Sequence, residues 1–418
     1  MKKKQAMRRT RRILCVLLPI LVFSLAVLLV ISRRLKDGRD RQEPPADYEA
    51  TVLDKEPDDR PEQTADGEIK QPQEPPSDGA ADEPQIPADA TADEPQTPAG
   101  KPEQPQEPVT LLFTGDVLLS DYVLSSYGQE GISGVLSPAL LDEMQNADIT
   151  VINNEFPFST RGEQAPDKQF TFRVNPDYVR VLTDMGVDLA GIANNHVLDF
   201  GPDALRDTFD TLTNAGIDYM GAGDDMERAS ALITKEINGK TFGFLAASRV
   251  IPVVSWDIRN ASPGVFTTYD PALLVAAIEA ARTQCDFLSV FVHWGIERDE
   301  YPQDYQVTMA KQYIDAGADL VVGAHPHVLQ GIAFYKDKPV FYSLGNFIFN
   351  REIARTAALK VTVGAEGAPV FRLIAASASN ARTVADDGDK RIATYDYLES
   401  ISQDVSIDEN GLVTQSAQ

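Results

Sequence analysis

The chain has 418 residues and carries 38 lysines and arginines against 63 aspartates and glutamates, so its formal net charge is −25. A domain with such an excess of acidic side chains is a poor candidate for binding phosphate backbones, and we expect no nucleic-acid partner. Its two cysteines are too few for a zinc site built from cysteines or for a disulfide framework.

The N-terminus predicts a membrane anchor. Residues 1–12 carry seven basic side chains and no acidic one, and residues 13–32 contain no charge. About 20 apolar residues are enough for a helix to cross ~30 Å of hydrocarbon. The alternative is a cleavable signal peptide, whose apolar core is usually shorter and ends at a small-residue cleavage site. The basic start favours a cytoplasmic tail, an uncleaved signal anchor and a single-pass protein of the cell membrane with the bulk of its chain extracellular.

Residues 33–108 are predicted to be a disordered linker. Within them, residues 42–108 hold 14 of the 27 prolines and 19 acidic side chains against 4 basic ones. Such a composition cannot bury enough apolar surface to fold. The expected role is a stiff spacer between membrane and domain, and ligand binding is the alternative.

The folded part is predicted to begin at residue 109 and to alternate strands with helices. Short apolar runs that end at polar residues indicate buried strands, and they cover residues 109–115, 148–154, 187–193, 287–292, 319–324 and 340–345. Prolines at positions 176, 202 and 271 follow capping residues and mark helix starts. The pair Asn238-Gly239 predicts a hairpin, so the α/β fold should contain mixed sheets.

The C-terminal part carries less information. Residues 359–363 and 370–374 are predicted to be closing strands, and residues 395–402 a short helix. The last dozen residues are predicted to be frayed.

The polar residues that follow the predicted strands form the main functional signal. They are Asp116, Glu155, Asn194, Asn195, His196, His293, His325, His327 and Asn346, and they include all four histidines of the chain. Ligands of α/β sheets bind at the carboxyl ends of strands. Imidazole, carboxylate and amide oxygen suit Mn, Fe, Zn or Mg, and a buried polar network is the alternative. His325 and His327 stand two residues apart, which would place both on one side of an extended segment.

Six motifs stand in a fixed order between residues 109 and 350. They are Thr114-Gly-Asp-Val117, Asn153-Asn-Glu-Phe-Pro157, Ala193-Asn-Asn-His-Val-Leu-Asp-Phe-Gly201, Val292-His-Trp-Gly-Ile-Glu297, Gly323-Ala-His-Pro-His-Val328 and Tyr342-Ser-Leu-Gly-Asn-Phe-Ile-Phe349. In this order they resemble the capsule-synthesis CapA family, which is tied to poly-γ-glutamate production and related to calcineurin-like metallophosphoesterases.

The resemblance implies a fold and a set of ligands. The fold would be a metallophosphoesterase-like sandwich of two mixed β-sheets flanked by helices over residues 109–375, followed by a C-terminal extension over residues 376–418. The roles that the resemblance assigns are these: Asp116 and His327 at a first metal, Glu155 bridging, Asn195, His293 and His325 at a second metal, and His196 as general acid oriented by Asp199. Leu118 stands where metallophosphoesterases usually have a histidine, and Glu155 where they have aspartate, so one or two metals are expected.

Four residues are expected to contact the substrate, and they are Asn194, Glu297, Asn346 and Arg173; Lys168 is a further candidate for an anion contact. The predicted function is synthesis or export of a poly-γ-glutamate-type capsule with a metal-dependent, hydrolase-like site for an anionic polymer or a phosphoester. One alternative is a non-catalytic subunit that binds the polymer beside other capsule-synthesis membrane subunits. Another is a secreted metallophosphoesterase unrelated to capsule.

Overall fold

The computed structural model describes residues 107–416. The expected cytoplasmic tail, the membrane anchor and nearly all of the linker fall within residues 1–106, outside the described residues. Among residues 107–416, no helix combines the length and the apolar character that crossing a membrane requires.

The larger of two main sheets has ten strands. Its strands are β1 (Val109–Val117), β2 (Ile149–Asn154), β3 (Leu189–Gly191), β4 (Asp218–Met220), β13 (Asn346–Ile348), β14 (Ile353–Val363), β15 (Val370–Ser379), β16 (Arg382–Ala385), β17 (Val405–Ile407) and β18 (Leu412–Gln415). They follow the order β17-β18-β15-β14-β1-β2-β3-β4, with β13 beside β1 and β16 beside β15. β1, β2, β3 and β4 are parallel neighbours, and β14 pairs with β1 antiparallel.

The second main sheet has six strands in the order β11-β12-β10-β9-β7-β6. Its strands are β6 (Ile233–Ile237), β7 (Lys240–Ser248), β9 (Phe287–His293), β10 (Leu320–Ala324), β11 (Ile332–Tyr335) and β12 (Lys338–Phe341). β7, β9, β10 and β12 run parallel, whereas β6 and β11 are antiparallel to their neighbours. The short strands β5 (Ala222–Gly223) and β8 (Gly264–Val265) form a separate pair.

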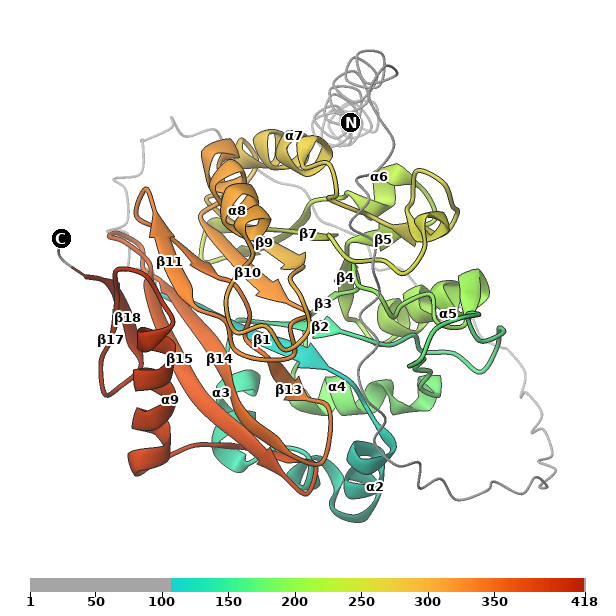
Figure 1. The fold of residues 1–418 in the computed structure, drawn as a ribbon, viewed down its shortest axis with the longest axis horizontal. Helices are drawn as coiled ribbons and strands as arrows, with labels where there is room; N and C mark the ends of the chain where they lie inside the picture. The colour runs from blue at the N-terminus through green and yellow to red at the C-terminus, as the bar shows by residue number, and fades with distance from the viewer. Residues whose placement is uncertain (1–106, 417–418) are drawn as a thin grey trace, which may run out of the picture. The chain divides into compact units, whose positions relative to one another are not determined.

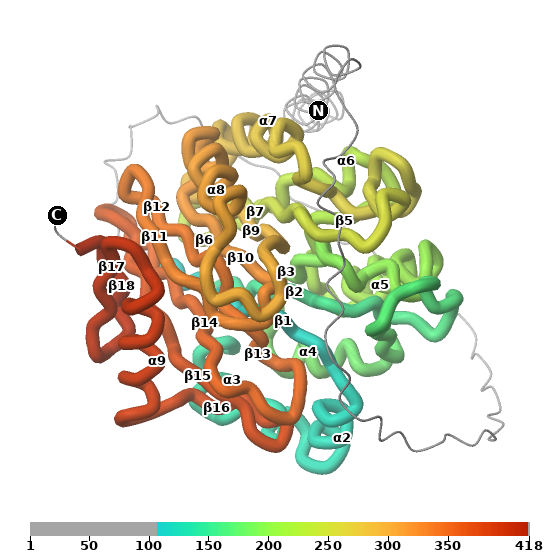
Figure 2. The backbone as a smooth tube through the Cα atoms, in the orientation of Figure 1, coloured from blue at the N-terminus to red at the C-terminus, as the bar shows by residue number. Residues whose placement is uncertain are grey.

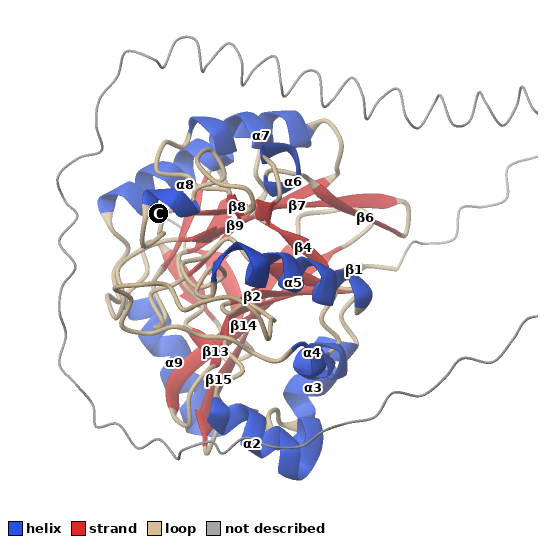
Figure 3. Cartoon of the chain, turned by 90° about the vertical axis from the view of Figure 1, so that its right-hand side faces the viewer, coloured by secondary structure: helices blue, strands red, loops and turns tan. Residues whose placement is uncertain are grey.

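Helices cover both main sheets (Figures 1 and 3). The helices are α2 (Asp121–Glu130), α3 (Pro138–Gln145), α4 (Val179–Met185), α5 (Gly201–Asn214), α6 (Met226–Ala229), α7 (Ala272–Arg282), α8 (Asp304–Ala316) and α9 (Gly388–Ser400), with 3₁₀ turns η1 (Gly131–Gly134), η2 (Pro176–Tyr178) and η3 (Val254–Trp256). In Figure 3, α7 and α8 lie on one side of the strands, and α2, α3, α4 and α9 lie on the other. The mixed α/β fold expected from the sequence is confirmed.

The core forms because each element buries one apolar face. In α5 the buried residues Leu205, Phe209 and Leu212 recur at helical spacing. A large apolar cluster lies between the two main sheets, where the rings of Phe113 and Phe244 approach to 6.4 Å. A second cluster packs α7 and α8 against the outer face of the six-stranded sheet.

The hairpin predicted from an Asn-Gly pair and the helix starts predicted from prolines agree with the structure. Asn238 and Gly239 both have positive φ, 50° and 74°, as a tight hairpin between β6 and β7 requires. Pro202 lies in the first turn of α5, and Pro271 caps α7. The run 340–345 is only partly a strand, because β12 ends at Phe341 and β13 begins at Asn346 after a turn.

The C-terminal prediction was partly wrong. The closing strands β14 and β15 are longer than expected, and α9 begins seven residues earlier, at Gly388 instead of Tyr395. Of the last dozen residues, 407–416 are described and are not frayed, because β18 pairs with β15 and β17 at one edge of the larger sheet (Figure 2). β15 also runs through residue 375, so residues 376–416 complete the same sheet.

Candidate metal centre

The carboxyl ends of parallel strands from both sheets bring the predicted metal ligands together. Asp116 lies near the end of β1, Glu155 directly follows β2, and His293 ends β9. His325 directly follows β10, and Asn195 comes from the loop after β3. Because parallel strands end at a common edge, five separate chain segments meet there.

Three overlapping groups of side chains have ligand atoms within 4.8 Å of one another. The groups are Glu155 with His293 and His325, Asp116 with Glu155 and His327, and Glu297 with His325 and His327. Glu155 belongs to two of them: its Oε1 lies 3.7 Å from Nε2 of His293 and 3.8 Å from Nε2 of His327. The resemblance to the family assigned a bridging role to Glu155, and that role stays a prediction.

Two buried atoms of the cluster have no hydrogen-bond partner. They are Oε1 of Glu155 and Nδ1 of His325. Buried polar atoms are almost always paired, because an unpaired one loses its hydration without replacement. A carboxylate oxygen and imidazole nitrogens that converge on one space are the donor set that suits Mn, Fe, Zn or Mg, so the residues fit a divalent cation.

His325 and His327 do not lie on an extended segment, and that expectation is wrong. Their φ angles are 100° and 60°, in the left-handed region that residues other than glycine rarely adopt. The cost is about 1–3 kcal/mol at each such position. The turn separates the two rings, whose centroids are 5.8 Å apart, and His327 Nδ1 reaches Asp116 Oδ2 at 3.1 Å. Both imidazoles still face the cluster: they share the group with Glu297, and each also belongs to one group with Glu155.

Burial and charge set the protonation of the cluster without a metal. Burial, with the nearby charge of Asp116, raises the pKa of Glu155 well above its usual range. Burial and the neighbouring imidazoles lower the pKa of His293 and His325, which holds them in the neutral form that binds metals. Burial alone would lower the pKa of His327, but Glu155 and Asp116 outweigh it and raise that pKa to about 10. A protonated His327 therefore supplies the positive charge among these carboxylates.

Asn153 links the cluster, and the sequence reasoning missed it. Its Nδ2 lies 2.7 Å from Asp116 Oδ1, 3.4 Å from His293 Nδ1 and 3.5 Å from Glu155 Oε2. Asn153 and Glu155 are two residues apart at the end of β2 and share one face, which was the available signal.

Asn194 lies in the framework behind the cluster. Its Nδ2 donates to Asn153 Oδ1 at 3.1 Å and to the backbone oxygen of Asn154, and its Oδ1 accepts from the backbone N–H of His196. The side chain is fully buried and does not line the cavity beside the cluster, so the predicted substrate contact of Asn194 has no support from this geometry.

His196 and Asp199 meet as expected, and Lys168 joins them. Nδ1 of His196 lies 2.7 Å from Asp199 Oδ2 and 2.9 Å from Lys168 Nζ, and Lys168 also pairs with Asp199. The backbone N–H of Phe172 donates to Asp199, and the Phe172 ring packs 4.4 Å from the imidazole. Burial, assisted by the charge of Lys168, lowers the pKa of His196 to about 4 although Asp199 opposes it. His196 is therefore neutral at pH 7.

A cavity of about 830 Å³ opens beside the cluster and contains three of the four expected substrate residues. These are Arg173, Glu297 and Asn346, and His196 and His327 line it too. Asn346 Oδ1 lies 2.9 Å from His327 Nδ1, and the Arg173 guanidinium packs 4.1 Å from the Phe200 ring. The sequence reasoning missed the aromatic part of the lining, which comprises Tyr122, Phe170, Phe172, Phe200 and Phe349. Their signal is weak because isolated aromatics usually belong to the core.

The fold and the site define an α/β protein of two mixed sheets with a buried histidine and carboxylate cluster that could hold a metal ion. Residues 110–351, more than half of the chain, match the family model described as "Bacterial capsule synthesis protein PGA_cap". The chain belongs to this bacterial capsule synthesis family, as its motifs indicated.

Three relatives are similar over much of the chain. The PGA biosynthesis protein CapA of Bacillus subtilis is 32% identical over 62% of this chain and 69% of its own length. The capsule biosynthesis protein CapA of Bacillus anthracis is 32% identical over 60% of this chain and 62% of its own length. A probable polyglutamine synthesis accessory protein of Mycobacterium tuberculosis is 35% identical over 49% of this chain and 56% of its own length.

Proposed function

We propose that this protein acts in the synthesis or export of a poly-γ-glutamate-type capsule through a metal-dependent, hydrolase-like site. Family membership and the names of the relatives support the capsule role. The main observation in favour of a metal is that two buried atoms, Glu155 Oε1 and His325 Nδ1, have no hydrogen-bond partner. Both belong to the group of candidate ligands formed by Glu155, His293 and His325.

Each side chain of the cluster has a place in this proposal. Asp116 and His327 hold a first position, Asn195, His293 and His325 hold a second, and Glu155 lies between them, as in a metallophosphoesterase-like centre. Asn346 stands opposite Asp116 in the pairing of β1 with β13. Its Oδ1 could replace the ligand that is lost where Leu118 stands. A divalent cation bound there supplies Lewis acidity and lowers the pKa of a bound water.

The remaining residues bind the substrate and manage its protons. Nδ1 of His196 donates its proton to the Asp199 carboxylate in the neutral imidazole, and Nε2 is then free to accept a proton from a group in the cavity. Arg173 provides a positive charge for an anionic polymer or phosphoester. Binding of a polyanion requires such cations, because residues 109–418 contain 42 acidic against 22 basic side chains, and this excess of negative charge would repel it.

A specific observation favours a second candidate function. Because the pKa of His196 is about 4, no imidazolium is present at pH 7 to act as a strong general acid. A non-catalytic subunit would use the same metal and cavity to hold the polymer, in contact with other capsule-synthesis membrane subunits. Under both candidates we propose that the chain is anchored in the cell membrane with this domain extracellular, which protease treatment of intact cells would test.

Turnover separates the two candidates. The full-length protein, loaded in turn with Mn, Fe, Zn and Mg, is incubated with poly-γ-glutamate and with simple phosphoesters. The chain length of the polymer and the phosphate released are measured. A hydrolase gives turnover that His196→Gln abolishes while the metal stays bound, and His293→Ala loses both. Polymer binding without turnover by any loaded form establishes the assembly subunit instead.

A further inference from the structure

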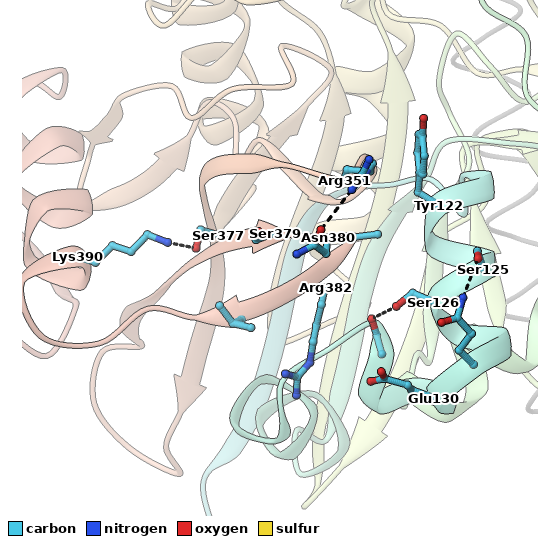
Figure 4. A pocket seen from close by; sticks show the side chains of 14 residues that line it. Tyr122, Ser125, Ser126, Glu130, Arg351, Ser377, Ser379, Asn380, Arg382 and Lys390 are labelled. Carbon is cyan, nitrogen blue, oxygen red and sulfur yellow. Dashed lines mark hydrogen bonds between the residues drawn. The ribbon is translucent and has the colours of Figure 1, made fainter. Parts of the chain in front are cut away.

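A second cavity, of about 780 Å³, lies between α2 and the strands β15 and β16 (Figure 4). Tyr122, Ser126 and Glu130 line it from α2, and Arg382 and Ser379 line it from the sheet. It contains none of the residues of the metal cluster.

The cavity is basic in an acidic domain. Its lining includes Arg351, Arg382 and Lys390 against the single carboxylate of Glu130. In residues 109–418 as a whole, acidic side chains outnumber basic ones by 42 to 22. The local excess of positive charge therefore runs against the composition of the domain, and it favours an anionic ligand.

The two guanidinium groups of the lining, those of Arg351 and Arg382, have no carboxylate partner within the described residues. Arg382 is partly buried, and its Nε has no hydrogen-bond partner. Arg351 lies over the Tyr122 ring at 5.4 Å and donates only to Asn380 Oδ1, at 3.3 Å. A guanidinium is a planar fork of donors that matches a carboxylate or phosphate, so both groups retain donors for a ligand.

Lys390 and Ser377 do not make this cavity a serine-nucleophile site. Ser377 donates to Asp386 Oδ1 at 2.7 Å, and Lys390 pairs with the same carboxylate at 3.0 Å. The Ser377 hydroxyl and the Lys390 ammonium therefore both point to Asp386, and this is not the arrangement in which a base activates a serine nucleophile. Binding of an anion is the chemistry that remains.

The two cavities adjoin one another at Tyr122. This residue lines both of them, and Asn350 and Arg351 are consecutive residues that line the metal-side cavity and the second cavity respectively. A flexible chain with a negative charge on every unit could therefore occupy both at once. Two linked sites raise affinity without any new kind of contact.

We propose that Arg351 and Arg382 form a second subsite for a carboxylate-bearing polymer whose neighbouring segment occupies the metal-side cavity. This subsite deepens the proposed function and rests on it. The subsite binds and positions the chain and takes no part in bond cleavage.

The test compares short and long ligands on the full-length, metal-loaded protein. Isothermal titration calorimetry is run with γ-linked glutamate chains of about two and about ten residues, lengths chosen to fill one subsite or to span both. The wild type should bind the long chain more tightly than the short one. The double variant Arg351→Gln, Arg382→Gln should weaken long-chain binding at least about tenfold, which is about 1.4 kcal/mol, and leave short-chain binding unchanged.

Arg355→Gln is the matched control. Arg355 lies in β14, four residues after Arg351 in the chain. Like Arg351 it packs over an aromatic ring (Tyr397, at 4.4 Å), but it does not line the cavity. It should bind both chains as the wild type does. Equal binding of the long chain by the double variant and the wild type overturns the subsite and leaves the proposed function intact. If the metal-loaded wild type binds neither chain, the proposed polymer function itself fails, and the subsite with it.

Discussion

Replacement of Glu155 by glutamine should change stability in opposite directions with and without metal. Glu155 is fully buried, and its Oε1 has no hydrogen-bond partner. Burial and the charge of Asp116 raise its pKa well above its ordinary value of 4.5. Without a metal, the carboxylate therefore destabilises the fold. With a metal bound, the same carboxylate is a ligand and stabilises it.

The magnitude follows from the burial. Desolvation of one ion costs several kcal/mol, and His327 offsets part of it, so metal-free Glu155→Gln should gain about 1–3 kcal/mol. In a domain of this size that is a rise in Tm of about 2–6 °C. Metal at about 100 times its Kd should stabilise the wild type by about 2.7 kcal/mol, and the variant should lose most of this gain.

The pH dependence has a definite sign. Because the pKa of Glu155 is higher in the folded state than in the unfolded state, the folded state binds the proton more tightly. Its contribution to stability therefore falls as the pH rises above about 4.5 towards the folded pKa. The difference in Tm between metal-free variant and wild type should widen over that interval.

Thermal unfolding, followed by circular dichroism with chelator and then with each metal, measures both effects. Asn153→Gln, which alters a neighbour without removing a buried charge, is the control for general disturbance of the site. Two results together would contradict this account: metal-free Glu155→Gln is less stable than the metal-free wild type, and no metal raises the Tm of the wild type. They would show that the ionised carboxylate stabilises a polar network. The metal-centre reasoning would then be wrong.

Three further predictions concern neighbouring groups. Asn153→Leu removes the hydrogen bonds to Asp116 and Glu155, so we expect metal affinity to fall about 10–100-fold in a metal titration, and unchanged affinity would show that Asn153 does not orient the ligands. Lys168→Met leaves Asp199 without its ion pair, so stability should fall by about 3 kcal/mol and the pKa of His196 should rise above about 4 by NMR titration; a pKa that stays there would remove Lys168 as a cause. Burial raises the pKa of Cys285 to about 11, so in a Cys15→Ser background iodoacetamide at neutral pH should label the thiol only after unfolding, and rapid labelling of the native protein would contradict its burial.

The sequence predicted the site well where strand order alone decides it. Runs such as residues 109–115 and 287–292 could be recognised as buried strands, and parallel strands bring their carboxyl ends to one edge. Asp116 and His293 could therefore be expected in the same cluster although 176 residues lie between them in the chain. The ordered motifs added the family, which the match over residues 110–351 bears out.

Other features depend on tertiary contacts that local patterns do not contain. The left-handed φ of His325 and His327 is imposed by their surroundings, and propensity argues against it. The spacing of Asn153 and Glu155 indicated a shared face, but the contact of Asn153 with Asp116 depends on the pairing of β1 with β2, which places the two residues opposite one another. β18 has only four residues, too few to show a clear alternating pattern, and its pairing with β15 and β17 on either side is what holds it in place.

The measurement that tests the metal centre most directly is the metal content of the full-length protein by elemental mass spectrometry. The protein is prepared with Mn, Fe, Zn and Mg supplied, beside the double variant His293→Ala, His325→Ala, with circular dichroism to check that both are folded. We predict one or two ions per chain in the wild type and none in the variant. A folded wild type that holds no metal after this supply would contradict the metal centre.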